Sequence, residues 1–113
     1  MEDFATKEIN NIRIEVVNLT RATYKEASEL KKILSNDNKL KIPKLIVDIS
    51  QCEFIDSTFL GVLVVSLKDM WEIGGEIRLV KPCFIANDLL ARVGTLKIFI
   101  TYDTLQEAVD SFN

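Results

Sequence analysis

Residues 45–63 read LIVDISQCEFIDSTFLGVL and join two patterns of different period. Leu45–Ile49 keeps a single polar residue, which predicts a central strand covered on both faces. Leu60–Trp71 carries apolar residues at helical spacing, which predicts a helix with one face in the core. Asp56 and Ser57 lie where this helix begins, and a helix offers free backbone N–H groups to an anion at that point.

The Ser57 hydroxyl has two interpretations at such a junction. We expect it to face solvent, which makes Ser57 a candidate phosphorylation site. Thr58 places a second hydroxyl beside it and is an alternative acceptor. The simpler interpretation is that Asp56 or Ser57 only caps the helix, as these residue types do in most proteins. The local sequence alone favours the cap, so the rest of the chain has to decide.

Strand and helix patterns alternate in the first half of the chain. Residues 12–16 alternate between apolar and polar, as in a half-buried strand. The turn signal Asn10-Asn11 before them predicts a hairpin with a partner strand over residues 4–9. Residues 23–26 have the spacing of a capping box and predict the start of a helix, which the polar residues 35–38 are expected to end.

The alternation continues in the second half. Gly74-Gly75 is expected to end the helix that contains Trp71, a residue we expect in the core. Strands are predicted over residues 76–80 and 97–101, with a helix over residues 82–93 between them. A second capping-box pattern, at residues 104–107, predicts a final helix.

This order predicts an α/β fold with a mixed, mostly parallel β-sheet and about four helices packed on it. The 113 residues suffice for a single core, and 48% hydrophobic with 27% charged residues is typical of a globular chain. The net charge of −3 gives no support for binding nucleic acid directly. No apolar run is long enough to span a bilayer and no signal peptide is recognised, so we expect a cytoplasmic protein without membrane insertion.

The residue types that enzymes and metal sites use are scarce. The chain contains no histidine, which excludes catalysis by serine-histidine or cysteine-histidine pairs. Cys52 and Cys83 lie far apart and are expected to be small apolar side chains. Neither GxGxxG nor GxxxxGK[ST] occurs. We therefore expect no catalytic residue, no metal and no cofactor.

Phe59 and Val62 share a helical face with Ser66, beside the predicted core stripe. Either a neighbouring helix covers them, or they form an apolar patch next to Ser57 that would bind a partner protein. Both alternatives stay open at the level of sequence.

Three segments carry a resemblance to a known family: Ile46–Ile49, Phe54–Leu63 and Gly74–Ile77. Together they resemble the STAS domain family, and most closely its stand-alone anti-sigma factor antagonists. The resemblance implies a single STAS domain over residues 1–113. It also implies that Ser57 is the phosphoacceptor and that Asp56 is the acidic residue beside it.

The function that the resemblance implies is partner switching. The expected partners are an anti-sigma factor that is a serine-protein kinase, and a phosphatase. The expected partner-binding residues are Asp56, Ser57, Thr58, Phe59 and Val62. Three features depart from the family pattern: Phe59 replaces a glycine, Thr23 replaces an acidic residue at the opening of the first helix, and Thr58 adds a second hydroxyl beside Ser57.

A second hypothesis needs no phosphate. The domain would be a constitutive scaffold in a stress-signalling assembly, or the small subunit of a lipid ABC transporter, with Ser57 only a helix cap.

Overall fold

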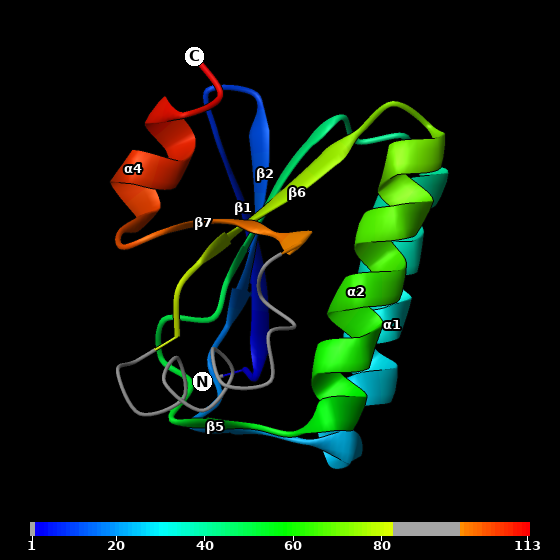
Figure 1. Ribbon diagram of the computed structural model, residues 1–113, viewed down its shortest axis with the longest axis vertical. Coiled ribbons are helices and arrows are strands. Elements are labelled where there is room, and N and C mark those ends of the chain that lie inside the picture. Colours follow the sequence, from blue (N-terminus) through cyan, green and yellow to red (C-terminus); the bar gives the residue numbers. More distant parts are fainter. Residues whose placement is uncertain (1, 83–97) are drawn as a thin grey trace.

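A five-stranded sheet forms the centre of the computed structural model, which describes residues 2–82 and 98–113 (Figure 1). Its strand order is β1-β2-β4-β6-β7. β1 is antiparallel to β2, and the other neighbouring pairs are parallel, which confirms the mixed, mostly parallel sheet. The strands are β1 (Phe4–Ile9), β2 (Ile12–Val17), β4 (Lys44–Asp48), β6 (Glu76–Val80) and β7 (Ile100–Tyr102).

The helices cover both faces of this sheet (Figure 1). The long helices α1 (Tyr24–Lys39) and α2 (Ser57–Glu72) pack on one face, and α4 (Leu105–Asp110) packs on the other. About four helices were expected, and the described residues contain three. A further helix was predicted over residues 82–93, and all of it except residue 82 lies outside the described residues.

β4 lies in the middle of the sheet because both of its faces are apolar. Leu45 and Val47 are fully buried against the layer of α1 and α2, while Ile46 faces the core under α4. In the parallel register, Leu45 lies beside Ile77 and Val47 beside Leu79, so the same alternation continues into β6. The central strand predicted from the apolar run is confirmed.

The hairpin between β1 and β2 also forms as predicted. Asn10 and Asn11 have φ values of 53° and 65°, a left-handed conformation that asparagine tolerates better than most residues. Two such residues in sequence make the turn that matches the twist of paired strands.

Two boundaries differ from the prediction. α1 does not end in the polar run of residues 35–38 but continues to Lys39. The reason is Asp37, whose side chain is buried and accepts a hydrogen bond from Arg13 Nη1 at 3.0 Å. The last strand begins only at Ile100, and Phe99 before it is buried in the core.

The polar residues of β2 lie on a buried face, although their alternation predicted a half-buried strand. Arg13 and Glu15 point to the side that α1 covers, and Glu15 is only 3% exposed. Thr6 Oγ1 donates a hydrogen bond to Glu15 Oε1. Burial, followed by the hydrogen bond with Asp37, raises the pKa of Glu15 to about 8. Asp37 Oδ2 is buried without a hydrogen-bond partner in the described part of the chain, so a neutral Glu15 beside Asp37 avoids a second buried negative charge.

Replacing Glu15 by Gln is expected to remove a pH dependence from the stability of the domain. The pKa of Glu15 rises from its ordinary value of 4.5 to about 8 on folding, so the native state binds this proton more tightly than the unfolded chain. The resulting stability is complete below the unfolded pKa and is lost as the pH rises through the folded pKa. Between about pH 5 and pH 9, wild type should lose on the order of 3 kcal/mol relative to Glu15→Gln in urea unfolding.

Glu8→Gln is the control for this comparison. Glu8 pairs with the same Arg13 at 3.2 Å but is exposed, so its variant should keep the wild-type slope with pH. Identical slopes for wild type and Glu15→Gln would show that Glu15 is ionised in the native state.

Candidate functional site

The two long helices begin side by side at one end of the domain (Figure 1). A short parallel pair, β3 (Arg21–Ala22) and β5 (Phe54–Ile55), leads into α1 and α2 respectively. The Asp56 N–H continues this pairing by donating to Ala22 O at 3.0 Å. Both helix N-termini are therefore held at the same level.

The Asp56 carboxylate joins these two N-termini. Its Oδ1 accepts a hydrogen bond from Phe59 N–H at 2.8 Å and caps α2. Its Oδ2 accepts a hydrogen bond from Tyr24 N–H, the first residue of α1, at 2.7 Å. A single negative charge thus lies at the positive ends of two helix dipoles, where it is stabilising.

α1 also has its own cap, as predicted. Thr23 is the N-cap, and Glu26 Oε1 accepts from the Thr23 N–H at 3.0 Å, which completes the capping box. The threonine that replaces an acidic residue of the family pattern therefore has a local role. The acid at this helix start is supplied from the side by Asp56.

Ser57 and Thr58 are the first two residues of α2, and both are exposed. Neither hydroxyl has a hydrogen-bond partner within the described residues, and their two N–H groups are left without an intrahelical acceptor. The interpretation of Ser57 as the helix cap is wrong, because Asp56 takes that role. The interpretation of Asp56 as the cap is confirmed.

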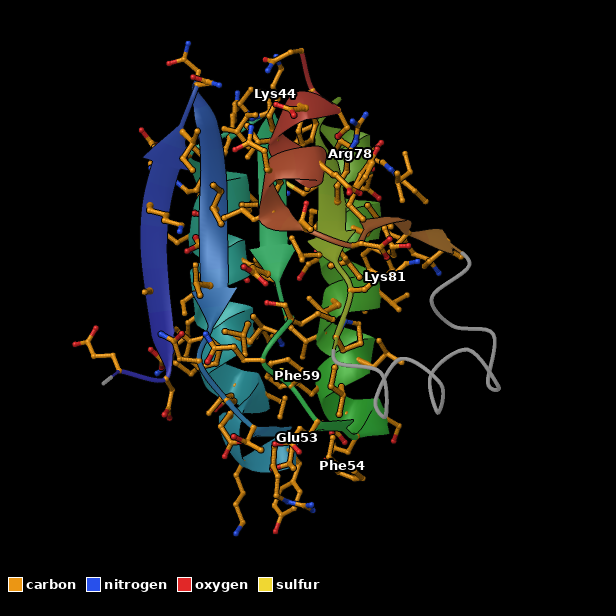
Figure 2. The ribbon with its side chains drawn as sticks, turned by 90° about the vertical axis from the view of Figure 1, so that its left-hand side faces the viewer. Lys44, Glu53, Phe54, Phe59, Arg78 and Lys81 are labelled. Atoms are coloured by element: carbon orange, nitrogen blue, oxygen red, sulfur yellow. The ribbon has the colours of Figure 1, made fainter. Side chains whose placement is uncertain are left out.

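Phe59 lies in the core and not on the surface. Its side chain is 0% exposed and packs in the cluster between the sheet, α1 and α2. Figure 2 shows it inside the domain, near Glu53 and Phe54 at the end where α2 begins. Of the two alternatives for Phe59, packing is correct, and its assignment as a direct partner contact has to be withdrawn. Its N–H is capped by Asp56 while its ring fills the space beneath the site.

Trp71 was expected in the core and is instead 47% exposed. Its Nε1 donates to Glu76 Oε1 at 3.2 Å, and Met70 takes the buried position on the last turn of α2. Space for Met70 exists because Gly75, which is buried, has no side chain to meet it.

A groove between α1 and α2 opens next to the exposed hydroxyls. Thr58 lines one end of it, and Val62, half-buried, forms part of its wall. Both residues were predicted from the sequence as site residues, whereas Gly61 and Val65, which also line the groove, were not. The signal was present in the spacing, since residues 58, 62 and 65 share one face of a helix.

Two basic side chains lie at the surface near this site. Arg21 and Lys25 are exposed around the start of α1, and the Arg21 guanidinium lies 4.4 Å from the centroid of the Phe54 ring. Among the described residues, no group of three or more His, Cys, Asp or Glu side chains is placed to hold a metal ion. In the same part of the chain, no helix has the length and apolar character needed to cross a membrane. Cys52 is buried in the core, and Cys83 lies outside the described residues.

Comparisons with known proteins agree with this architecture. Residues 5–108 match the family model of the STAS domain. A curated protein of Thermotoga neapolitana, provisionally named as an anti-sigma factor antagonist homolog, is 36% identical over 67 residues. The match covers 59% of this chain and 59% of that protein, so less than two thirds of the relative is represented.

Solved structures extend the likeness over nearly the whole chain. A crystal structure from Thermotoga maritima, with the same provisional description, has a TM-score of 0.81 at 26% identity, over 96% of this chain and 92% of that chain. The Bacillus cell fate determinant SpoIIAA, in its phosphorylated form, has a TM-score of 0.74 at 13% identity, over 97% and 99% of the two chains. At this low identity, the second likeness supports the fold alone.

Replacing Asp56 by Ala should weaken the starts of both long helices. The expected loss of unfolding free energy is about 1–3 kcal/mol, because two backbone N–H groups lose their acceptor together. Asp56→Asn keeps one acceptor oxygen and should fall between Ala and wild type. Thr104→Ala is the reference for the loss of one cap, because only the Glu107 N–H of α4 loses its acceptor. It should lower the unfolding free energy by about 0.5–2 kcal/mol. If Asp56→Asn has the same unfolding free energy as wild type in urea, the hydrogen bond from one of the two helices contributes nothing to stability.

Replacing Phe59 by Ala should cost about 3–5 kcal/mol of unfolding free energy, because it empties a fully buried site. Val65→Ala, on an exposed position of the same helix, should stay within about 0.5 kcal/mol of wild type. Thermal or urea unfolding measures both. A Phe59→Ala variant with unchanged stability would place the ring on the surface after all.

Proposed function

This chain belongs to the STAS domain family, and on that premise we propose that it is a cytoplasmic anti-sigma factor antagonist that works by partner switching. With Ser57 unmodified, the surface around Ser57 and the first turns of α2 binds an anti-sigma factor that is also a serine-protein kinase. The sigma factor held by that kinase is then released. Phosphorylation of Ser57 ends the binding, and a phosphatase restores it. The domain is a binding module and not an enzyme.

The observation that carries this proposal is the separation of roles between Asp56 and Ser57. Asp56 accepts the hydrogen bonds at the start of α2, so the exposed Ser57 hydroxyl is not needed for the fold. A kinase can reach such a hydroxyl without unfolding the helix. Thr58 is exposed in the same way and is the alternative acceptor.

The domain would tolerate a phosphoryl group at this position. The group adds about −1.5 to −2 charges and three acceptor oxygens. The N–H groups of Ser57 and Thr58 are available to it, and a helix N-terminus favours an anion by about 0.3–1 kcal/mol. The modification therefore leaves the fold intact.

Binding responds differently to the same charge. On docking, the phosphoryl group would lose its water next to the Asp56 carboxylate, and the cost of burying two like charges opposes the complex. The surface that the partner meets consists of Asp56, Ser57, Thr58 and Val62, without Phe59. Switching then follows from desolvation at the interface and needs no rearrangement of the core.

The constitutive alternative, a scaffold or a transporter subunit, loses its original structural argument. It assigned Ser57 to the helix cap, and Asp56 occupies that position. A constitutive binder would hold its partner equally well with and without a charge at Ser57, so the same experiment separates the two functions.

Ser57→Asp should weaken binding to the anti-sigma factor at least tenfold, and Ser57→Ala should bind like wild type. The probe is each purified anti-sigma factor of the serine-kinase class from the same organism, titrated by calorimetry. Incubation with that kinase and ATP should label wild type at Ser57 and leave Ser57→Ala unlabelled, as read by mass spectrometry.

Asn36→Asp is the matched control, because it adds one charge on an exposed position near the other end of α1. It should bind like wild type. The switch at Ser57 would be refuted by labelling at Thr58 or elsewhere with Ser57 unmodified, or by full binding of Ser57→Asp.

A further inference from the structure

The groove between α1 and α2 has a volume of about 310 Å³ and starts at Thr58, one residue after the proposed phosphorylation site. A Cβ atom added at Gly61 would meet nothing within 4 Å, so this glycine leaves the groove open. Val65 is 58% exposed and, with the half-buried Val62, makes an apolar strip along α2. The surface is therefore hollow, carries an apolar strip between polar walls, and is continuous with the switch.

We propose that this groove receives an amphipathic helix of the anti-sigma factor, whose apolar face packs on Val62 and Val65. The inference rests on the proposed function and identifies the part of the partner that the site binds. Apolar grooves between helices commonly take a helix in this way, through anchors spaced three and four residues apart.

The length of the groove corresponds to about three turns of such a helix. From Thr58 to Asp69 the α2 wall is about 16 Å long, or three helical turns. An extended strand would need an exposed sheet edge for its hydrogen bonds, and the backbone groups along both walls are already bonded within helices. A partner helix brings its own backbone hydrogen bonds and needs only side-chain contacts.

The charges on the walls restrict the partner further. Lys31 lies on the α1 wall and Asp69 on the α2 wall, nearer the far end. A helix that carries an acidic residue opposite Lys31 and a basic residue opposite Asp69 matches both. Such complementarity selects one direction of the bound helix and suppresses the reverse one.

The test compares Val65→Asp with Leu40→Asp. Both positions are exposed apolar residues, at 58% and 56%, and only Val65 lines the groove. Binding of the purified anti-sigma factor should fall at least thirtyfold for Val65→Asp and stay within twofold for Leu40→Asp, as measured by calorimetry. When the kinase is added in large excess with ATP, it should phosphorylate both variants to the same extent as wild type. Mass spectrometry measures this extent.

Gly61→Leu blocks the groove without disturbing the fold. The added side chain has free space at its Cβ, and replacing glycine inside a helix should leave the melting temperature unchanged or higher. We expect binding to fall at least thirtyfold. Lys31→Glu should weaken binding severalfold, with a smaller effect at high salt.

The outcomes separate this inference from the proposed function. Loss of binding for Ser57→Asp but not for Val65→Asp or Gly61→Leu would overturn the groove and leave the switch intact. Unchanged binding for all three variants, or no binding by wild type, would overturn both. A change in oligomeric state of Val65→Asp without the anti-sigma factor would show that a second copy occupies the groove, and this also overturns the inference.

Discussion

The arrangement of both long helices depends on the carboxylate of Asp56. Without it, two helix N-termini with unpaired N–H groups and positive partial charges would lie side by side at the end of the β3–β5 pair. The positive ends of the two helices would repel each other. The Asp56 carboxylate offsets this repulsion by accepting one hydrogen bond from each helix, at 2.7 and 2.8 Å, and so joins α1 to α2. The residue next to the proposed switch is thus also a structural residue, and the position of Ser57 follows from it.

Sequence reasoning succeeded where local chemistry decides the structure. The Asn10-Asn11 turn and the capping box at Thr23 act through their own backbone, and the apolar run of β4 indicates its burial on both faces by composition alone, so a short segment suffices to recognise each of them. The end of α2 belongs to the same class, because Gly74 adopts a φ of 78° that few other residues tolerate. These local signals also place Asp56 and Ser57 at the start of a helix.

The predictions from sequence were wrong where a residue far away in the chain determines the local structure. The polar run at the end of α1 resembles a helix stop, but Arg13 of β2 reaches Asp37 and keeps the last turn helical. Glu15 is tolerated in the interior because Thr6 and Asp37 lie beside it. Met70 replaces Trp71 in the core because Gly75 leaves it room. None of these partners is adjacent in sequence, so periodicity alone could not rank the alternatives.

The division of α2 into two faces connects these results with function. Phe59 departs from the glycine of the family pattern, and its ring enters the core, so it strengthens the inner face of the helix. Gly61, two residues later, points to the opposite side and keeps the groove toward α1 open. Residues that stabilise the domain and residues that would meet a partner therefore alternate along the same helix. Asp56 and the half-buried Val62 take part in both, whereas Ser57 is exposed, so changes in charge at Ser57 can alter binding while the core stays unchanged.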